Sequence, residues 1–327
     1  MLACQPMEST LIKAALGYDS KMVFIVGPPR SGTTLLYEAM VTRYRFGYIS
    51  NVAHRLYKTP ATATKLFAQC IAGWRGRFAS RYGHISGWGS PNEGGWVWRR
   101  WIPEEHYLDA DKTDAIPIEI IRGTFAAISQ ILRGPMLNKN VMHSVHMQVL
   151  DRLFPGCLYI AMHRNLVDNV RSVLHARIET NGLAQINQWL SVKPRGWERF
   201  QYAAAVDQVA FQVRLTTKHI LEDASILGTE RLCCLAYEDL CDHPEVTMNQ
   251  VREFLAGHGI TVEDRLLLPE RFTLSPGRPL PVDLETQLKT ITEPGIQSNA
   301  EAHPSQRRKC NVLMTLEPDE RKSKRNR

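Results

Sequence analysis

Short apolar runs alternate with amphipathic stretches along most of this chain. Four of the runs have the length and apolar character of buried strands, and they cover residues 22–27, 136–142, 157–162 and 232–237. Strands that alternate with helices in this way predict a parallel sheet with helices on both faces. The pattern therefore predicts a three-layer α/β fold, in which a central, mostly parallel sheet is flanked by helices.

Apolar residues at helical spacing mark the stretches between these runs. The spacing predicts helices over residues 32–44, 118–133, 145–153, 165–177 and 199–223, and a further helix that begins near residue 243. Residues 46–60 begin a loop-rich or helical insert, and residues 73–110 form a long irregular segment with Trp96, Trp98 and Trp101. Such segments in compact domains are often functional, and a surface lid with a packing role alone is the alternative.

The apolar pattern weakens toward the C-terminus. Beyond about residue 262 the chain is proline-rich and poorly periodic, and the stretch that ends in DERKSKRNR lacks a strong apolar pattern. A segment of this kind cannot bury enough apolar surface to fold by itself. We therefore expect a single α/β domain over residues 20–290 and a disordered basic tail over residues 291–327.

The charge balance is basic, with a formal net charge of +7. Part of the excess lies in the tail, and the rest suits an anionic cofactor or an acidic substrate. The sequence has no helix–turn–helix, zinc-finger or RNA-binding aromatic pattern. No nucleic acid is therefore expected among the partners.

Targeting patterns are missing from the sequence. There is no run of about 18 apolar residues, which predicts no transmembrane helix, and residues 1–20 lack the pattern of a signal peptide. The seven cysteines are odd in number and form no CxxC pair. A disulfide framework is not expected, and the cysteines indicate a reducing, cytoplasmic location.

The sequence VFIVGPPRSGTT at residues 23–34 carries the first chemical signal. Gly27 and Gly32 bracket a loop that leaves a predicted strand and enters a predicted helix. Backbone N–H groups at such a helix start point at one spot, and the helix dipole favours an anion there. A phosphate-like group is therefore expected near residue 30.

This loop has the GxxxxG spacing of a P-loop but not its chemistry. A P-loop for nucleoside triphosphates has a lysine directly after the second glycine, where this chain has Thr33, and the basic residue here is Arg30. GPPRSGTT closely resembles the 5′-phosphosulfate loop of sulfotransferases that use 3′-phosphoadenosine 5′-phosphosulfate (PAPS). A glycine turn without a ligand is the alternative, and the strand, loop and helix signals in register argue against it.

A second anion site is predicted within residues 159–174, which read YIAMHRNLVDNVRSVL. Arg164 lies where the strand ends, and Ser172 follows eight residues later on the next predicted helix. An arginine fork and a hydroxyl in these places can converge on one phosphate. The spacing resembles the 3′-phosphate motif of PAPS-dependent sulfotransferases, although a lone arginine at a strand end is more often a plain surface residue.

Further segments extend the resemblance over about residues 22–256. LNKN at 137–140 with VLDRLFPGCLYIAMHR at 149–164, and AYEDLCDHPEVTMNQVREFLA at 236–256, resemble tyrosylprotein sulfotransferases and related bacterial enzymes. The resemblance implies a P-loop NTPase-like fold and an in-line transfer of a sulfuryl group from PAPS to a hydroxyl or amine acceptor. The implied product is 3′,5′-adenosine bisphosphate, and no metal is implied.

The resemblance also implies roles for particular residues. The 5′-phosphosulfate would be held by Arg30, Ser31, Gly32, Thr33 and Thr34. Lys139 matches a lysine that meets the transferring group, with a solvated loop lysine as the alternative. Arg164 and Ser172 would hold the 3′-phosphate. Ser275 and Arg278, in LSPGRP, are expected to close over the cofactor.

Three residues are candidates for the general base. Tyrosylprotein sulfotransferases carry a glutamate pair where this chain has Ser50 and Asn51, which puts a tyrosylprotein substrate in doubt. His54 follows three residues later, and histidine titrates near neutrality. Glu93 lies in the irregular segment, and His143 follows Lys139 by four residues. An ordinary polar role is the alternative for each. The expected catalytic residues are Arg30, Lys139, His54 and Glu93.

Other functions remain open at this point. An atypical P-loop kinase is the first alternative, and Thr33 together with the Arg164–Ser172 pair argues against it. A catalytically silent sulfotransferase-like module that binds a partner is the second, favoured by the lack of an obvious base. His143 and His146 have the spacing of a metal pair but no evident third ligand, so no metal is expected. The acceptor can be a small molecule, lipid, sugar or peptide.

Overall fold

The computed structural model describes residues 4–18, 20–80, 83–102, 106–109, 116–274 and 279–291. The predicted tail, apart from residue 291, lies outside these residues, and so do Ser275 and Arg278. The structural statements below concern only the described part of the chain.

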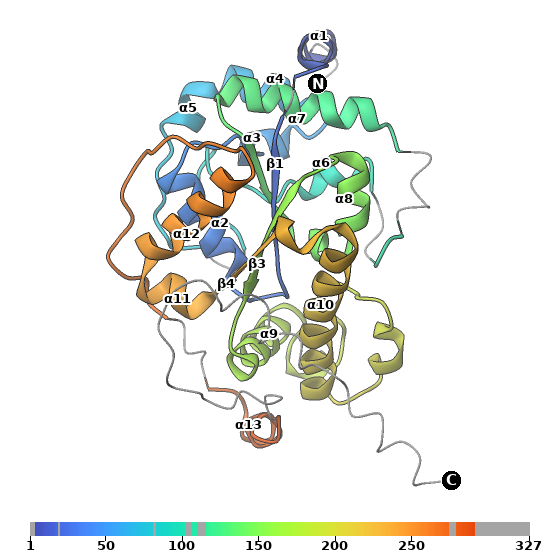
Figure 1. The fold of residues 1–327 in the computed structure, drawn as a ribbon. Helices are drawn as coiled ribbons and strands as arrows, with labels where there is room; N and C mark the ends of the chain where they lie inside the picture. The colour runs from blue at the N-terminus through green and yellow to red at the C-terminus, as the bar shows by residue number, and fades with distance from the viewer. Residues whose placement is uncertain are drawn as a thin grey trace.

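A parallel four-stranded sheet lies at the centre of the described residues (Figure 1). Its strands are β1 (Met22–Val26), β2 (Met136–Lys139), β3 (Leu158–His163) and β4 (Leu232–Ala236), in the order β2-β1-β3-β4. All neighbouring strands run parallel. The four predicted strands are therefore confirmed, and the sheet is the predicted parallel one.

The strand register places the carboxyl ends of the strands at one edge of the sheet. Ile25 is paired with Lys139 across β1 and β2, and Val26 is paired with Ala161 across β1 and β3. On the other side of β3, His163 is paired with Ala236. The segments that follow β1, β3 and β4 therefore leave the sheet together, at the edge where ligands bind in folds of this type.

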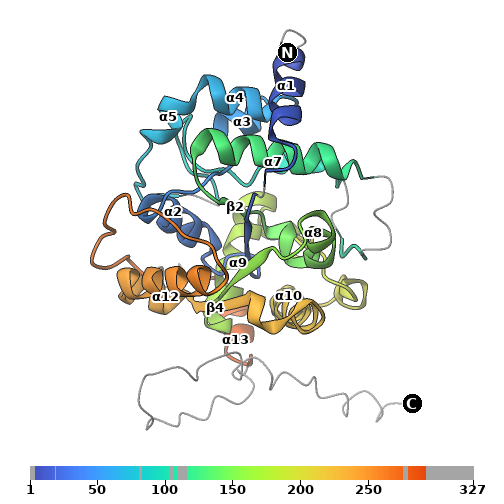
Figure 2. The ribbon, with the colours of Figure 1, turned by 45° about the horizontal axis from the view of Figure 1, so that its top comes forward.

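Helices cover both faces of the sheet, because side chains alternate along β1. Met22, Phe24 and Val26 enter one apolar cluster, and Val23 and Ile25 enter the other. The first cluster includes side chains of α7 (Ile118–Leu132), α8 (Met147–Leu153) and α10 (Ala205–Leu227). The second includes side chains of α2 (Thr33–Arg43) and α12 (Pro244–Gly257). Figures 1 and 2 show these two groups of helices on opposite sides of the sheet, which confirms the three-layer architecture.

The helices of the described residues follow the sequence pattern closely. They are α1 (Gln5–Ala15), α2 (Thr33–Arg43), α3 (Asn51–Arg55), α4 (Pro60–Leu66), α5 (Ala68–Ala72), α6 (Gly95–Arg99), α7 (Ile118–Leu132), α8 (Met147–Leu153), α9 (Leu166–Asn181), α10 (Ala205–Leu227), α11 (Tyr237–Asp242), α12 (Pro244–Gly257) and α13 (Val282–Leu288). Short 3-10 helices lie at Val141–Val145, Leu183–Gln185, Trp197–Phe200 and Thr229–Arg231. The insert after residue 46 is helical, and residues 74–80 and 83–94 carry no helix.

Several helices differ from the prediction. Helix α9 continues to Asn181, beyond the predicted end at residue 177, α6 lies within the segment predicted to be irregular, and α11 was not predicted. The predicted helix over residues 199–223 begins later, at Ala205, because residues 197–200 form a separate 3-10 turn and Tyr202 is 92% exposed. The apolar periodicity that included Tyr202 was therefore misleading at that end. Helix α13 was not predicted, because it is only seven residues long and follows a proline-rich stretch.

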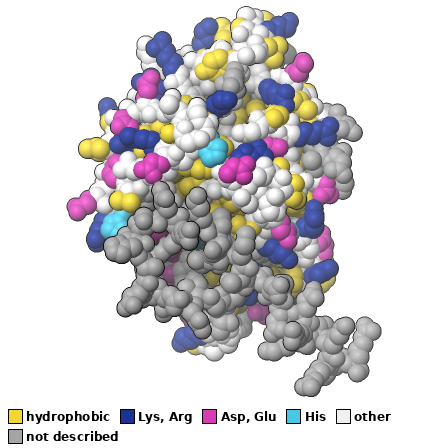
Figure 3. All heavy atoms as spheres, in the orientation of Figure 1, with side chains coloured by type: hydrophobic (Ala, Val, Ile, Leu, Met, Phe, Trp, Pro, Cys, Tyr) yellow, Lys and Arg dark blue, Asp and Glu magenta, His cyan; other side chains and the backbone are white. Residues whose placement is uncertain are grey.

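Basic and acidic side chains are interspersed on the face of the molecule shown in Figure 3. On that face the described lysines and arginines do not gather into a single stripe.

We predict that Phe24→Ala lowers the free energy of unfolding by about 3–5 kcal/mol, because a fully buried aromatic ring would leave a cavity. The Phe24 side chain is 0% exposed, and its ring centroid lies 5.0 Å from that of His143 and 6.0 Å from that of Phe154. Urea unfolding measures the change. The control Tyr202→Ala, at an exposed site, should change stability by less than about 0.5 kcal/mol. Equal effects of the two substitutions would contradict this assignment of the core.

Candidate active site

The loop after β1 is held in place by two other elements. The Ser144 hydroxyl donates to the Gly27 carbonyl and accepts from the Gly27 N–H, both at 2.9 Å, and Ser144 belongs to the 3-10 helix Val141–Val145. The Asn169 amide on α9 donates to the Pro29 carbonyl at 2.7 Å. These bonds fix the backbone of the loop directly before α2, where free N–H groups and the helix dipole favour an anion.

Gly32 is required by its close approach to Tyr237. The residue has a φ of 98°, and a Cβ atom there would lie 2.3 Å from Cδ2 of Tyr237. Tyr237 is the first residue of α11, directly after β4, and the guanidinium carbon of Arg164 lies 4.6 Å from the centroid of its ring. Tyr237 thus supports both predicted anion sites. Sequence reasoning did not single it out, although its position after a strand in AYEDL was the available signal.

The two predicted anion motifs meet in space. Arg30 Nε donates to the Ser172 hydroxyl at 3.3 Å, and Arg164 Nη1 donates to the Arg30 carbonyl at 3.4 Å. Arg30 has a φ of 65°, a left-handed conformation that is uncommon for a residue with a side chain. The sequence assigned Arg30 and Ser172 to different phosphates, whereas the structure puts them in direct contact.

Lys139 lies at the same edge, at the end of β2. Its Nζ donates to Thr34 Oγ1 at 3.0 Å and forms an ion pair with Glu93 Oε1. The lysine side chain is only 5% exposed, and the Glu93 side chain is 33% exposed. Two residues predicted independently as catalytic are therefore paired beside the start of α2.

A cavity of about 710 Å³ opens at this edge. Its walls include most of the predicted cofactor-binding and catalytic residues, namely Arg30, Gly32, Thr33, Thr34, Glu93, Lys139, Arg164 and Ser172. Ser31 does not line it, and the buried Ser31 hydroxyl has no hydrogen-bond partner among the described residues. Arg77, Arg271 and Tyr237 also line the cavity, and the sequence analysis did not single them out.

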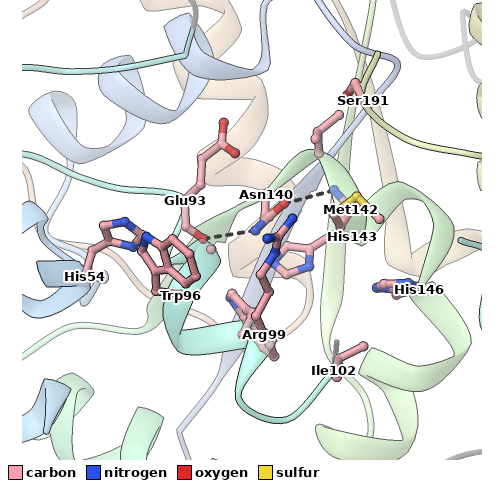
Figure 4. A pocket seen from close by; sticks show the side chains of 13 residues that line it. His54, Glu93, Trp96, Arg99, Ile102, Asn140, Met142, His143, His146 and Ser191 are labelled. Carbon is pink, nitrogen blue, oxygen red and sulfur yellow. Dashed lines mark hydrogen bonds between the residues drawn. The ribbon is translucent and has the colours of Figure 1, made fainter. Parts of the chain in front are cut away.

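A second cavity of about 450 Å³ adjoins the first and shares Glu93, Val141 and Ser191 with it. Figure 4 shows the second cavity, with His54 and Trp96 on one side of Glu93 and Asn140. Further lining residues include Trp98, Arg99, Ile102, Met142, His143 and His146. Glu93 is therefore the one predicted catalytic residue among those described that lines both cavities.

His54 lies on α3 and lines the second cavity only. Its Nδ1 is buried without a hydrogen-bond partner among the described residues. Burial lowers the pKa of His54 and nearby His84 lowers it further, while the charge of Glu93 partly offsets the shift. The imidazole is therefore neutral at pH 7 and able to accept a proton or a hydrogen bond.

Ser50 and Asn51, at the positions of the glutamate pair of tyrosylprotein sulfotransferases, have structural roles. The Ser50 hydroxyl accepts from the Ala53 N–H at 3.3 Å and caps α3. The Asn51 amide donates to the carbonyls of Ile85 and Gly87, both at 2.7 Å. These bonds attach the irregular segment before Glu93 to α3.

His143 is buried, with 2% of its surface exposed, although it lines the second cavity. Its Nε2 lies 2.6 Å from Asn138 Oδ1, which also accepts from Trp98 Nε1 at 2.8 Å. Burial lowers the pKa of His143 well below its ordinary value. His146 makes a separate contact, from its Nε2 to the His106 carbonyl at 2.8 Å. Within the described residues, no three histidine, cysteine or acidic side chains gather to hold a metal ion.

A family pattern and several solved structures are similar to this chain. The sequence pattern of the sulfotransferase family matches residues 22–264. Sulfotransferase STF9 from Mycobacterium avium has 15% identity and a TM-score of 0.49, with 88% of this chain and 70% of that chain covered. For sulfotransferase STF1 from Mycobacterium tuberculosis H37Rv the identity is 14% and the TM-score 0.47, with 88% and 74% covered.

The sulfotransferase domain of the curacin biosynthetic pathway has 16% identity and a TM-score of 0.40, with 77% of this chain and 76% of that chain covered. A search of curated proteins finds no match. No helix among the described residues is long and apolar enough to cross a membrane. Because the family pattern spans residues 22–264 of the 327 in the sequence, the chain belongs to the sulfotransferase family.

Proposed function

We propose that this protein transfers a sulfuryl group from PAPS to a hydroxyl or amine of an acceptor, by in-line displacement at sulfur. The observation that carries the proposal is the convergence of Arg30, Lys139, Arg164 and Ser172 on one cavity at the carboxyl edge of the sheet. Three cations and a helix N-terminus suit a donor with two phosphates and a sulfonate.

The residues at the cavity fit this donor in two groups. Arg30 and the backbone and hydroxyls of residues 31–34 would hold the 5′-phosphosulfate, and of these residues Arg30, Gly32, Thr33 and Thr34 line the cavity. Arg164 and Ser172 would hold the 3′-phosphate. When bound, PAPS supplies the sulfuryl group and a phosphate leaving group.

Catalysis in this proposal rests on charge and position. Negative charge grows on the leaving phosphate and on the sulfonate oxygens, and Arg30 and Lys139 stabilise it. The acceptor lies in the second cavity, beside His54 and Trp96. We assign the general base to Glu93, because it lines both cavities while His54 and His143 line only the acceptor side. His54 then positions the acceptor.

The two alternative functions, an atypical kinase and a catalytically silent module, predict different binding and turnover. An atypical kinase needs magnesium and a nucleoside triphosphate, and a silent module binds the nucleotide without turnover. A cytoplasmic location is part of the proposal, because the six cysteines of the described residues are all free. The acceptor that binds in the second cavity can still be a small molecule, a lipid, a sugar or a peptide.

We predict that Arg164→Ala weakens binding of 3′,5′-adenosine bisphosphate at least tenfold, a loss of about 1.4 kcal/mol, because a charge-assisted bond to the 3′-phosphate is removed. The affinity for adenosine 5′-phosphate, which lacks the 3′-phosphate, should fall less than threefold. Titration calorimetry without magnesium measures both. Arg152→Ala, at an exposed arginine of α8 outside the cavity, is the control and should bind both nucleotides as the parent does. An equal loss for both nucleotides would contradict the assignment of the 3′-phosphate site.

We predict that Glu93→Gln lowers the rate of sulfuryl transfer by about 10²–10⁴-fold, because the base is removed, and leaves nucleotide binding within about threefold. Transfer of ³⁵S from labelled PAPS to a panel of hydroxyl and amine acceptors measures the rate. His54→Gln should lower it by less than tenfold. A greater loss in His54→Gln than in Glu93→Gln would move the base to His54, and no transfer by the parent to any acceptor would favour the silent module.

We predict that chelation of divalent metal by EDTA leaves the affinity for 3′,5′-adenosine bisphosphate unchanged, because arginine and lysine side chains supply the positive charge at the cavity. The same titration with ATP and magnesium tests the kinase reading. Tighter binding of ATP with magnesium than of the bisphosphate without it would overturn the sulfotransfer proposal.

A further inference from the structure

Two adjoining cavities lie at the opposite edge of the sheet from the candidate active site. Their volumes are about 320 Å³ and 360 Å³, and they share Arg45 and Arg133. Lys21, directly before β1, and Pro135, directly before β2, line the second of them. The cavities therefore face the amino ends of the strands, and none of their lining residues belongs to the donor or acceptor cavity.

The charge of this pair of cavities is strongly unbalanced. The first cavity adds Arg265 to the shared arginines, and the second adds Lys21. The single acidic side chain among the lining residues is Glu263, which pairs with Arg45 at 2.9 Å. Four basic side chains and one acidic side chain among the described residues therefore line this pair of cavities.

Arg265 is held in the wall of the first cavity by backbone carbonyls, including that of Trp74 at 3.2 Å. Its guanidinium donates to the carbonyls of Val41 at 2.7 Å and Ala72 at 2.8 Å, which fixes its position. Burial lowers the pKa of Arg265, and although Tyr48 raises it, nearby Arg45 and Arg75 lower it further. Like charges held close together are unfavourable unless an anion lies between them.

Arg133 occupies a position that usually favours glycine. It ends α7 with a φ of 58° and a ψ of 46°, the left-handed conformation of a helix C-terminus, and Gly134 follows it. Its side chain is exposed and makes no hydrogen bond or ion pair with any described residue. A positively charged side chain therefore stands, at some conformational cost, where the two cavities meet.

We infer that these two cavities form a second anion-binding site, which takes a small molecule with at least two phosphate, sulfate or carboxylate groups. One anionic group contacts the arginines of the first cavity, and the other contacts Lys21 and Arg133 in the second. The site is separate from sulfuryl transfer, and its occupation does not depend on the proposed donor.

The test is a calorimetric titration of the full chain with fructose 1,6-bisphosphate and, separately, with fructose 6-phosphate. Both titrations are repeated with Arg164→Ala, which changes the donor cavity and leaves the inferred site intact. We expect the bisphosphate to bind at least tenfold more tightly than the monophosphate. Equal affinities would overturn the inference of two anionic subsites, and loss of sugar bisphosphate binding in Arg164→Ala would assign that binding to the donor cavity.

The decisive variant is Arg133→Asn, which removes the charge and keeps a residue that tolerates the left-handed conformation. The substitution should weaken binding of the sugar bisphosphate at least tenfold and leave the melting temperature of the protein unchanged. Lys218→Asn, which removes an exposed charge on α10 far from these cavities in sequence, is the control and should bind as the parent does. Unchanged affinity in Arg133→Asn, or an equal loss in both variants, would show that the arginines are only a solvated basic surface.

Discussion

The backbone hydrogen bonds that align β1 with its parallel neighbours β2 and β3 position the residues of the candidate active site. They pair Ile25 with Lys139 and Val26 with Ala161. With this register, the loop after β1 and Arg164 after β3 leave the sheet beside the end of β2. A slip of one residue would turn every side chain of the shifted strand to the opposite face. Both faces of β1 are buried in apolar clusters, and this packing fixes the strand register. The register in turn fixes the relative positions of the residues at the candidate site.

Positive charge is concentrated at this edge, and the structure offsets it locally. The Arg164 guanidinium lies over the Tyr237 ring and donates to the Arg30 carbonyl. Lys139 pairs with Glu93. These partners reduce the repulsion between the cations and keep the side chains in the wall of the cavity. At the amino edge of the sheet, Arg45 pairs with Glu263 and Arg265 donates to backbone carbonyls, whereas the Arg133 side chain has no hydrogen bond or ion pair with the described residues.

The strands and the anion loop could be predicted because their signals are local. A short apolar run followed by glycines at 27 and 32 specifies a strand, a loop and a helix start without reference to the rest of the chain. Local signals failed where the helical period continued past the true end, as at Tyr202, and where an element was too short, as at α13. They also gave no role to Asn51, whose amide donates to carbonyls that lie 34 and 36 positions away in the sequence.

By itself, the sequence determined the α/β class, the order of strands and helices along the chain, and the residues around which anion binding is proposed. Only the tertiary structure decided that Arg30 contacts Ser172, that Lys139 pairs with Glu93, and that Tyr237 closes over Gly32. These contacts join residues that lie 142, 46 and 205 positions apart, as the sequence numbers give. Periodicity and turn chemistry act over a few residues, whereas such pairs form only after strand register and helix packing have fixed the distances between elements.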